Sequence, residues 1–317
     1  MQTTHEQELF CVAEEEEGSR LDLLLAKRFP HLSRTYFQRL IEEGFVLING
    51  ERVKKRETPE EGDEIEICFQ VTKELSLEPE NIPLDILYED PYLIAINKPP
   101  GMVVHPAPGH WSHTFVNALI YHCKNCPTPD PLRPGIVHRI DKDTSGVLIA
   151  AKTVEAHQAL VSLFASRKIE KLYLCVCVGN PPNGLLSAPI GRNPAHRKEM
   201  TVLPDGKEAI THFSVAAFNQ RLSLVVARPK TGRTHQIRVH LKHLKTPILG
   251  DELYGAMKTN LALGAPRQLL HAYRLTFAHP ITGEPLHITA PIPEDMKGWM
   301  QQLCGPALCE SLLPQAK

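Results

Sequence analysis

The sequence has no apolar run close to the roughly 18 residues that a membrane-spanning helix needs, so we expect no membrane association. Its start lacks the basic region and apolar stretch of a secretory signal, and its eight cysteines lack the spacing of a disulfide framework. These absences favour free thiols in a reducing cytoplasm. An excess of one charge is also missing, because a net charge of -1 by itself indicates neither a nucleic-acid nor a membrane partner.

Motifs that hold cofactors are absent as well. The sequence contains neither the GxGxxG of dinucleotide sites nor the GxxxxGK[ST] of P-loops. Cys123 and Cys126 form a CxxC, but no second CxxC supplies the other two ligands of a zinc site. We therefore predict no metal and no nucleotide cofactor.

Residues 18–70 have the pattern of a small domain with two helices and a hairpin. Ser33 is a typical N-cap for the second helix, and Gly44 is a typical stop. Asn49 and Gly50 stand between two short apolar pairs, which is the strongest short hairpin signal. This order resembles the S4 RNA-binding module.

Local charge supports RNA binding by this domain only modestly. The stretch from Arg20 to Arg56 contains nine Lys and Arg residues but only four Asp and Glu residues. Arg34 and Arg39 fall on the second helix, and a basic run at 54–56 follows the hairpin. The alternative is an ordinary solvated face, because acidic residues after Arg56 cancel the excess.

The chain after residue 84 is rich in short apolar strands. Residues 70–84 lack periodicity, which is typical of a linker, so we predict a second domain over residues 84–298. Its strands outnumber its helices and do not alternate with them. This favours an α+β fold with a mixed, largely antiparallel sheet over a doubly wound fold.

Two polar segments interrupt the apolar pattern of this domain. The first is HRIDKDTSG, residues 138–146, and the second, residues 228–245, holds six Lys and Arg, three His and no acid. On a helix, Ile237, Leu241 and Leu244 form one apolar stripe, and Arg238 lies beside it. An arginine at the border of a core needs a partner, so we predict an ion pair with an aspartate of the first segment.

Five motifs in order carry a family resemblance. They are AINKPPGMVVHPAPG, GIVHRIDKDTSG, EKLYL, TGRTHQIRVHL and LLHAYRLTFAHP, spread from about Leu84 to Pro293. Together they resemble the RluA family of pseudouridine synthases, which modify large-subunit ribosomal RNA and transfer RNA. A preceding S4 module suits the same family.

The resemblance implies an isomerase that turns specific uridines of RNA, above all large-subunit (23S) ribosomal RNA, into pseudouridine without a cofactor. Asp141 occupies the position of the catalytic nucleophile, and Arg238 would keep its carboxylate charged. Tyr173 would stack on the target base, and Arg139 would enter the RNA helix as the uridine leaves. We also expect RNA contacts from Lys98, Arg233, His235, Arg34 and Arg39. The expected partner is ribosomal RNA or a pre-ribosomal particle, bound by a cytoplasmic monomer.

Other interpretations stay open. Asp141 could be only a turn residue, and Tyr173 only a core tyrosine. Asp143 and Thr144 are interpreted as turn residues, and His138, His235 and His240 receive no catalytic role. A non-catalytic RNA-binding assembly factor would need a broken nucleophile, arginine or tyrosine position, and all three are intact. A methyltransferase would need a glycine-rich cofactor loop, which the sequence lacks.

Overall fold

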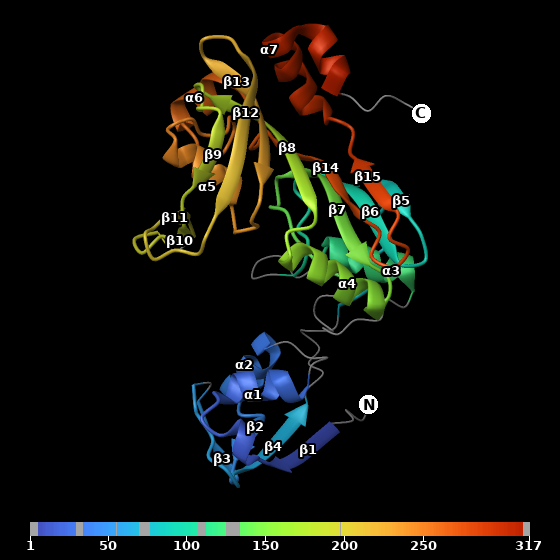
Figure 1. The fold of residues 1–317 in the computed structure, drawn as a ribbon, viewed down its shortest axis with the longest axis vertical. Coiled ribbons are helices and arrows are strands. Elements are labelled where there is room, and N and C mark those ends of the chain that lie inside the picture. The colour runs from blue at the N-terminus through green and yellow to red at the C-terminus, as the bar shows by residue number, and fades with distance from the viewer. Residues whose placement is uncertain are drawn as a thin grey trace. The chain divides into compact units, whose positions relative to one another are not determined.

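The computed structural model describes residues 6–29, 34–54, 56–69, 77–106, 112–124, 134–196 and 198–312 (Figure 1). They divide into two compact units: the first holds the described residues up to Pro79 together with Pro134, and the second holds Glu80–Lys124 and the described residues from Gly135 on. The division falls within the predicted linker, whose residues 70–76 lie outside the described ranges. Each unit has its own hydrophobic core and is described by itself.

The N-terminal unit consists of two helices on a four-stranded antiparallel sheet of order β1-β4-β2-β3. A short 3-10 turn, η1, follows the first strand. The boundary predicted at residue 18 leaves out β1, which pairs along the whole of β4. The elements are β1 (Glu6–Cys11), η1 (Glu14–Glu16), α1 (Leu21–Arg28), α2 (Arg34–Glu43), β2 (Val46–Ile48), β3 (Glu51–Arg52) and β4 (Glu64–Phe69).

Turn residues set the ends of these elements as the sequence predicted. Helix α2 ends before Gly44, which adopts a left-handed φ of 81°. Asn49 and Gly50 both have positive φ and join β2 to β3, as a two-residue hairpin requires. The predicted N-cap, Ser33, lies outside the described residues.

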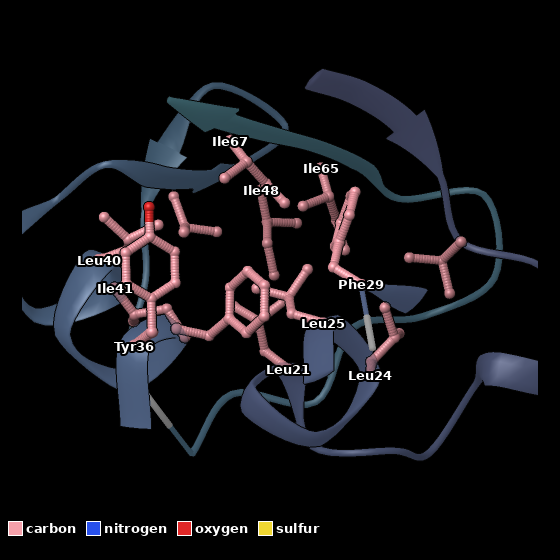
Figure 2. Close-up of a cluster of buried hydrophobic side chains, with 13 residues drawn as sticks. Leu21, Leu24, Leu25, Phe29, Tyr36, Leu40, Ile41, Ile48, Ile65 and Ile67 are labelled. Atoms are coloured by element: carbon pink, nitrogen blue, oxygen red, sulfur yellow. The ribbon is translucent and has the colours of Figure 1, made fainter. Parts of the chain in front are cut away.

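The core of this unit lies between the helices and the sheet. Figure 2 shows side chains of α1 and α2 pointing toward Ile48, Ile65 and Ile67 of the strands. Leu21, Leu25 and the two β4 isoleucines are fully buried. Burial of each such side chain stabilises the fold by about 1.5–3 kcal/mol, so the unit has a core that does not depend on the rest of the chain.

The C-terminal unit is built on a nine-stranded sheet of order β5-β6-β7-β14-β8-β13-β12-β9, with β15 beside β14. Only the β7–β14 pair within it is parallel, so the predicted mixed, largely antiparallel sheet is confirmed. A separate two-stranded sheet joins β10 and β11. The strands are β5 (Ile86–Glu89), β6 (Leu93–Lys98), β7 (Ser145–Ala151), β8 (Glu170–Val178), β9 (Gly184–Ser187), β10 (Ile190–Arg192), β11 (Met200–Val202), β12 (Ile210–Phe218), β13 (Leu222–Pro229), β14 (Leu270–Ala278) and β15 (Pro285–Thr289).

Helices pack on both faces of the sheet (Figure 1). Leu174 and Val176 of β8 pack with side chains of α7, whereas Cys175 and Cys177 pack on the opposite face with α5. The two cysteines thus share one side of a buried strand, as residues two positions apart in a strand do. The helices are α3 (Phe115–Cys123), α4 (Val154–Ala165), α5 (Gln236–His243), α6 (Met257–Leu263) and α7 (Glu294–Leu312), which has non-helical backbone at Gly305 and extends past the predicted boundary at residue 298.

Candidate active site

Asp141 lies in a tight turn immediately before β7. The Thr144 N–H donates to the Asp141 carbonyl at 3.1 Å, so Asp143 and Thr144 shape the turn as predicted. Gly146 follows with a φ of 111°, and a Cβ on it would lie 2.2 Å from the Ala272 carbonyl oxygen of β14. Only glycine lets β7 begin this close to its parallel neighbour, so Gly146 fixes where the turn sits.

The glycine requirement gives a stability prediction. Gly146→Ala should destabilise the C-terminal unit by about 2–4 kcal/mol, because it adds both a backbone clash and left-handed strain. Tryptophan fluorescence during urea unfolding measures this, since Trp299 belongs to this unit and the sequence of residues 1–79 contains no tryptophan.

The matched control is Gly298→Ala on α7, where an added Cβ meets nothing within 4 Å. We expect it to stabilise by about 0.5–1 kcal/mol, because alanine favours a helix. Equal stability of the two variants would contradict the role given to Gly146.

The ammonium group of Lys98 binds the backbone of this turn. Its side chain is fully buried, and its ammonium group donates to the carbonyls of Lys142 (2.8 Å), Pro99 (2.7 Å) and Met102 (2.9 Å). Burial lowers the pKa of Lys98 to about 7, and the negative charge of Asp143 opposes this shift. With its three donors used on carbonyls, Lys98 positions the backbone of the turn.

Arg267 and Gln268 bind the same turn through side-chain hydrogen bonds. The buried guanidinium of Arg267 donates to the Asp143 carbonyl at 2.9 Å and to the Ser145 hydroxyl at 3.2 Å. Gln268 donates to the Thr144 hydroxyl at 3.2 Å. Four consecutive residues after Asp141 are thus held by side chains from elsewhere, so the turn has little freedom to move.

Arg238 of α5 bridges two carboxylates. Its Nη1 lies 3.0 Å from Asp141 Oδ2, while Nε and Nη2 lie 2.7 and 3.0 Å from the two oxygens of Asp251. Asp251 also accepts the backbone N–H groups of Leu253 and Tyr254. The planar fork is therefore fixed by Asp251, and its remaining donor faces Asp141.

This arrangement keeps Arg238 charged and leaves Asp141 accessible. Burial lowers the pKa of Arg238, but hydrogen bonds and charge from Asp251, then from Asp141, outweigh it and hold the pKa above the ordinary value. The Asp141 side chain is 19% exposed, against 8% for Arg238 and 0% for Asp251. Asp141 is thus the carboxylate of this trio that can meet a ligand.

A cavity of about 460 Å³ opens over Asp141, within the usual size range of ligand sites. Tyr173 on β8 lines it from the same sheet face as Cys175. Burial raises the pKa of the Tyr173 hydroxyl, and the charge of Asp141 raises it further, so the hydroxyl stays protonated. The wall is otherwise strongly basic, with Arg139, Arg167, Lys171, Lys230, Arg233 and Arg238 among its residues.

His138 lies in the cavity wall as a neutral ring. Its Nε2 accepts the Ile149 N–H at 3.0 Å, and the ring stacks on Phe164 with centroids 4.7 Å apart. Burial, then the charge of Lys171, lowers the pKa of His138 to about 3. A ring without a proton on Nε2 at neutral pH cannot act there as an acid, in agreement with the structural role predicted for it.

Comparisons with known proteins match both units. Residues 92–243 match the family model of RNA pseudouridylate synthases, and residues 19–65 match the S4 domain. A protein of Xanthomonas campestris named ribosomal large subunit pseudouridine synthase D is 41% identical over 297 residues, which cover 90% of this chain and 89% of that protein. An uncharacterized RNA pseudouridine synthase of Bacillus subtilis is 43% identical over 294 residues, covering 92% and 96%.

This chain belongs to the RNA pseudouridine synthase family. The resemblance seen in its five motifs, and that of the N-terminal unit to S4 domains, are confirmed. Among solved structures, human RNA pseudouridylate synthase domain containing 4 is similar at 26% identity and a TM-score of 0.55, over 69% of this chain and 93% of that one.

The cavity of this pseudouridine synthase gathers most of the residues predicted for its site. Asp141, Tyr173 and Arg238 lie in its wall, together with Arg139, which is exposed, and Arg233, whose Nε also donates to the Glu208 carbonyl. His235 lines it too. The helical wheel correctly pointed Arg238 at an aspartate of the first polar segment.

The structure corrects the role predicted for Lys98. It was expected to contact RNA, but it is buried and does not line the cavity. Lysine is usually a surface residue, and no pattern in the sequence indicates that three carbonyls converge on this one. Its place is under the turn that carries Asp141.

Arg34 and Arg39, the RNA contacts expected in the S4 unit, both form ion pairs within it. Arg34 pairs with Asp22 at 2.9 Å, and Arg39 pairs with Glu43 at 2.7 Å. The Asp22 side chain is fully buried, while that of Arg34 is 44% exposed. The pair therefore holds the arginine against α1 and still leaves part of it accessible to a ligand.

Within the described ranges, no group of three or more His, Cys, Asp or Glu is placed to hold a metal ion, and Cys126 of the CxxC lies outside these ranges. No helix there is long and apolar enough to cross a membrane.

Proposed function

We propose that this enzyme isomerises uridines of large-subunit ribosomal RNA to pseudouridine, with Asp141 as the nucleophile. The observation that carries the proposal is the Asp251–Arg238–Asp141 chain at the base of the cavity. It pairs the Asp141 carboxylate with an anchored arginine and leaves it accessible from the cavity. Similarity to relatives supports the substrate class. Proteins named ribosomal large subunit pseudouridine synthase D are 41% identical in Xanthomonas campestris and 40% identical in Vibrio parahaemolyticus.

The proposed reaction requires one ionised carboxylate and no co-reactant. The N1–C1′ bond breaks, a C5–C1′ bond forms, the C5 proton leaves and N1 gains a proton, so atoms and electrons balance without a co-reactant. Asp141 attacks the nucleotide or removes a proton from it, and either role needs an ionised side chain. The reaction therefore needs no cofactor.

Tyr173 and Arg139 handle the flipped nucleotide in this proposal. Tyr173 lies in the cavity wall beside the charge of Asp141, where its ring can stack on the uracil. Arg139, exposed at the same cavity and two residues from Asp141, can fill the gap that the nucleotide leaves in the RNA.

Tritium release tests the proposal. The enzyme would be incubated without cofactor with large-subunit rRNA, small-subunit rRNA or transfer RNA, each labelled at C5 of uridine. We expect release from large-subunit rRNA alone. Release from transfer RNA alone would mean that transfer RNA is the substrate. Release from none of the three RNAs would favour a non-catalytic assembly factor.

Replacement of Tyr173 separates its ring from its hydroxyl. We expect Tyr173→Phe to keep most of the activity, because the ring still stacks, and Tyr173→Ala to lose about 10-fold or more, since stacking is worth about 1–3 kcal/mol per base. Single-turnover rates and RNA affinities measure both. A loss with phenylalanine as severe as with alanine would move the role to the hydroxyl.

We propose that the S4 unit selects the site on the RNA, with limits close to residues 18–70, and that residues 84–298 hold the chemistry. Deletion of residues 1–75 should leave an active enzyme that modifies uridines with less choice. The slope of log affinity against log salt should become shallower by about 0.7–0.9 for each phosphate that the shortened chain no longer binds.

Carbodiimide primer extension maps the pseudouridines made by the full and shortened chains. The full chain with Arg34→Ala and Arg39→Ala serves as the matched variant, because it keeps the apolar S4 core, and Arg20 and Gln38 still bind the Asp22 carboxylate that loses Arg34. An unchanged map and an unchanged salt slope in the shortened chain would argue against selection by this unit.

We further propose a monomeric enzyme in the cytoplasm. Asp141, Arg238 and Tyr173, the residues that the proposed reaction uses, meet in one cavity of the same chain. Ribosomal RNA as substrate supports the location.

A further inference from the structure

His235 stands at the start of α5 in a conformation that favours glycine. Its φ is 55° and its ψ is 21°, in the left-handed region. The imidazole lines the same cavity as Asp141 and Arg238. Residues other than glycine adopt this conformation in turns and at functional sites, and the position of His235 in the cavity wall favours a function.

Tyr254 determines which ring nitrogen of His235 carries the proton. Its hydroxyl oxygen lies 2.7 Å from His235 Nδ1 and accepts the Met200 N–H at 2.8 Å. Tyr254 is buried, and Nδ1 is the one acceptor that the hydroxyl meets among the described residues. The hydroxyl proton therefore goes to Nδ1, so the neutral ring has its own proton on Nε2.

The surroundings keep this ring neutral. Burial lowers the pKa of His235, the charge of Asp141 raises it, and Arg238 lowers it again; Asp251 and Arg139 contribute smaller opposing effects. Nε2 has no hydrogen-bond partner within the described ranges. The cavity wall thus contains a neutral N–H donor beside the carboxylate of Asp141.

We propose that His235 donates this Nε2–H to an oxygen of the target uridine, either a uracil carbonyl or the ribose 2′-hydroxyl. The proposal rests on the proposed function, and it makes His235 a substrate-binding residue and Tyr254 a positioning residue. Because Met200 belongs to β11, the β10–β11 hairpin is tied to the cavity through the Tyr254 hydroxyl. The uracil carbonyls and the ribose hydroxyl are uncharged, so a neutral N–H donor suits them. The arginines of the cavity wall prefer anionic oxygens such as those of phosphate.

The tautomer can be measured without any assay of activity. Nitrogen-15 NMR of the histidine rings in the full chain, with the His235 signal identified by its loss in His235→Gln, should show a bare Nδ1 and a protonated Nε2 from pH 7 to 8. In Tyr254→Phe we expect a mixture of tautomers and an upward shift of the pH at which the ring gains its second proton. A protonated Nδ1 in the wild-type enzyme, or a doubly protonated ring at pH 7, would overturn the assignment.

Kinetics test the contact with substrate. Glutamine can place an amide N–H near the Nε2 position, so His235→Gln should stay within about 5-fold of wild type, whereas His235→Ala should lose about 10-fold or more in kcat/KM. The matched control is His287→Gln, because His287 is an exposed residue of β15 and lies outside the cavity; this variant should behave as wild type. Equal rates for His235→Ala and wild type would refute the contact.

A substrate with 2′-deoxyuridine at a site that the wild-type enzyme modifies distinguishes the two oxygens. If the alanine penalty vanishes on it, the acceptor is the 2′-hydroxyl; if the penalty persists, the acceptor is a carbonyl. Should the wild-type enzyme modify no RNA at all, the proposed function fails, while the NMR result still decides the tautomer.

Discussion

Asp141→Asn should reduce isomerisation below a few per cent of wild type and leave RNA affinity within a few fold. The change keeps the size and shape of the side chain and removes only its charge. Arg238 stays in place because Asp251 holds it through two hydrogen bonds. An amide is a poor nucleophile and a poor base, so the chemical step fails while the basic wall still binds RNA.

Single-turnover rates and filter binding on the same rRNA measure the two effects separately. Asp205→Asn is the matched control, since this residue is exposed in the turn after β11 and lies outside the cavity wall. It should leave both quantities unchanged. Turnover of the Asp141 variant above a few per cent would contradict a nucleophilic role.

Arg238→Lys should fail almost as badly as Arg238→Ala, with each losing about 100-fold or more in the chemical step. Arginine uses three nitrogens here, two on Asp251 and one on Asp141, in one plane. A single ammonium group on a flexible stem cannot reproduce this fork. The variants also leave the fully buried Asp251 short of a partner, which costs about 3–5 kcal/mol of stability.

The stability loss and the catalytic loss must be told apart. Rates should therefore be compared at a temperature where circular dichroism shows every variant folded. Arg221→Lys, at an exposed position immediately before β13, is the matched conservative change and should be neutral. Near-normal activity of Arg238→Lys would mean that the guanidinium supplies charge alone.

The helical wheel and the motifs were sufficient to predict the Arg238–Asp141 pair, because an amphipathic stripe fixes which side chains reach the edge of a core. The second anchor, Asp251, could not be predicted. It lies 13 residues from Arg238 in a loop, and no periodic pattern relates the two. Tyr254, which sets the proton position of His235, belongs to the same loop and was missed for the same reason.

Strands of the C-terminal unit were predicted where a short apolar run stands between polar or turn residues, as in β6 and β7. Strand β14 lies in the middle of the sheet, yet its sequence carries only a weak strand pattern. A register shift between Ala272 and Arg274 breaks its alternation, and His271 is a buried polar residue within it. Strand β1 was missed because it holds only a few apolar residues and depends on pairing with β4.

The most direct test of the account is a count of pseudouridine in large-subunit rRNA made in vitro and treated with dialysed enzyme. The RNA would be hydrolysed to nucleosides and separated by chromatography, with Asp141→Asn treated in parallel. We predict that the wild-type enzyme makes pseudouridine without any added cofactor and that the variant makes none while binding the same RNA. Pseudouridine from the variant, or none from the wild-type enzyme, would contradict a site built on the Asp141 carboxylate.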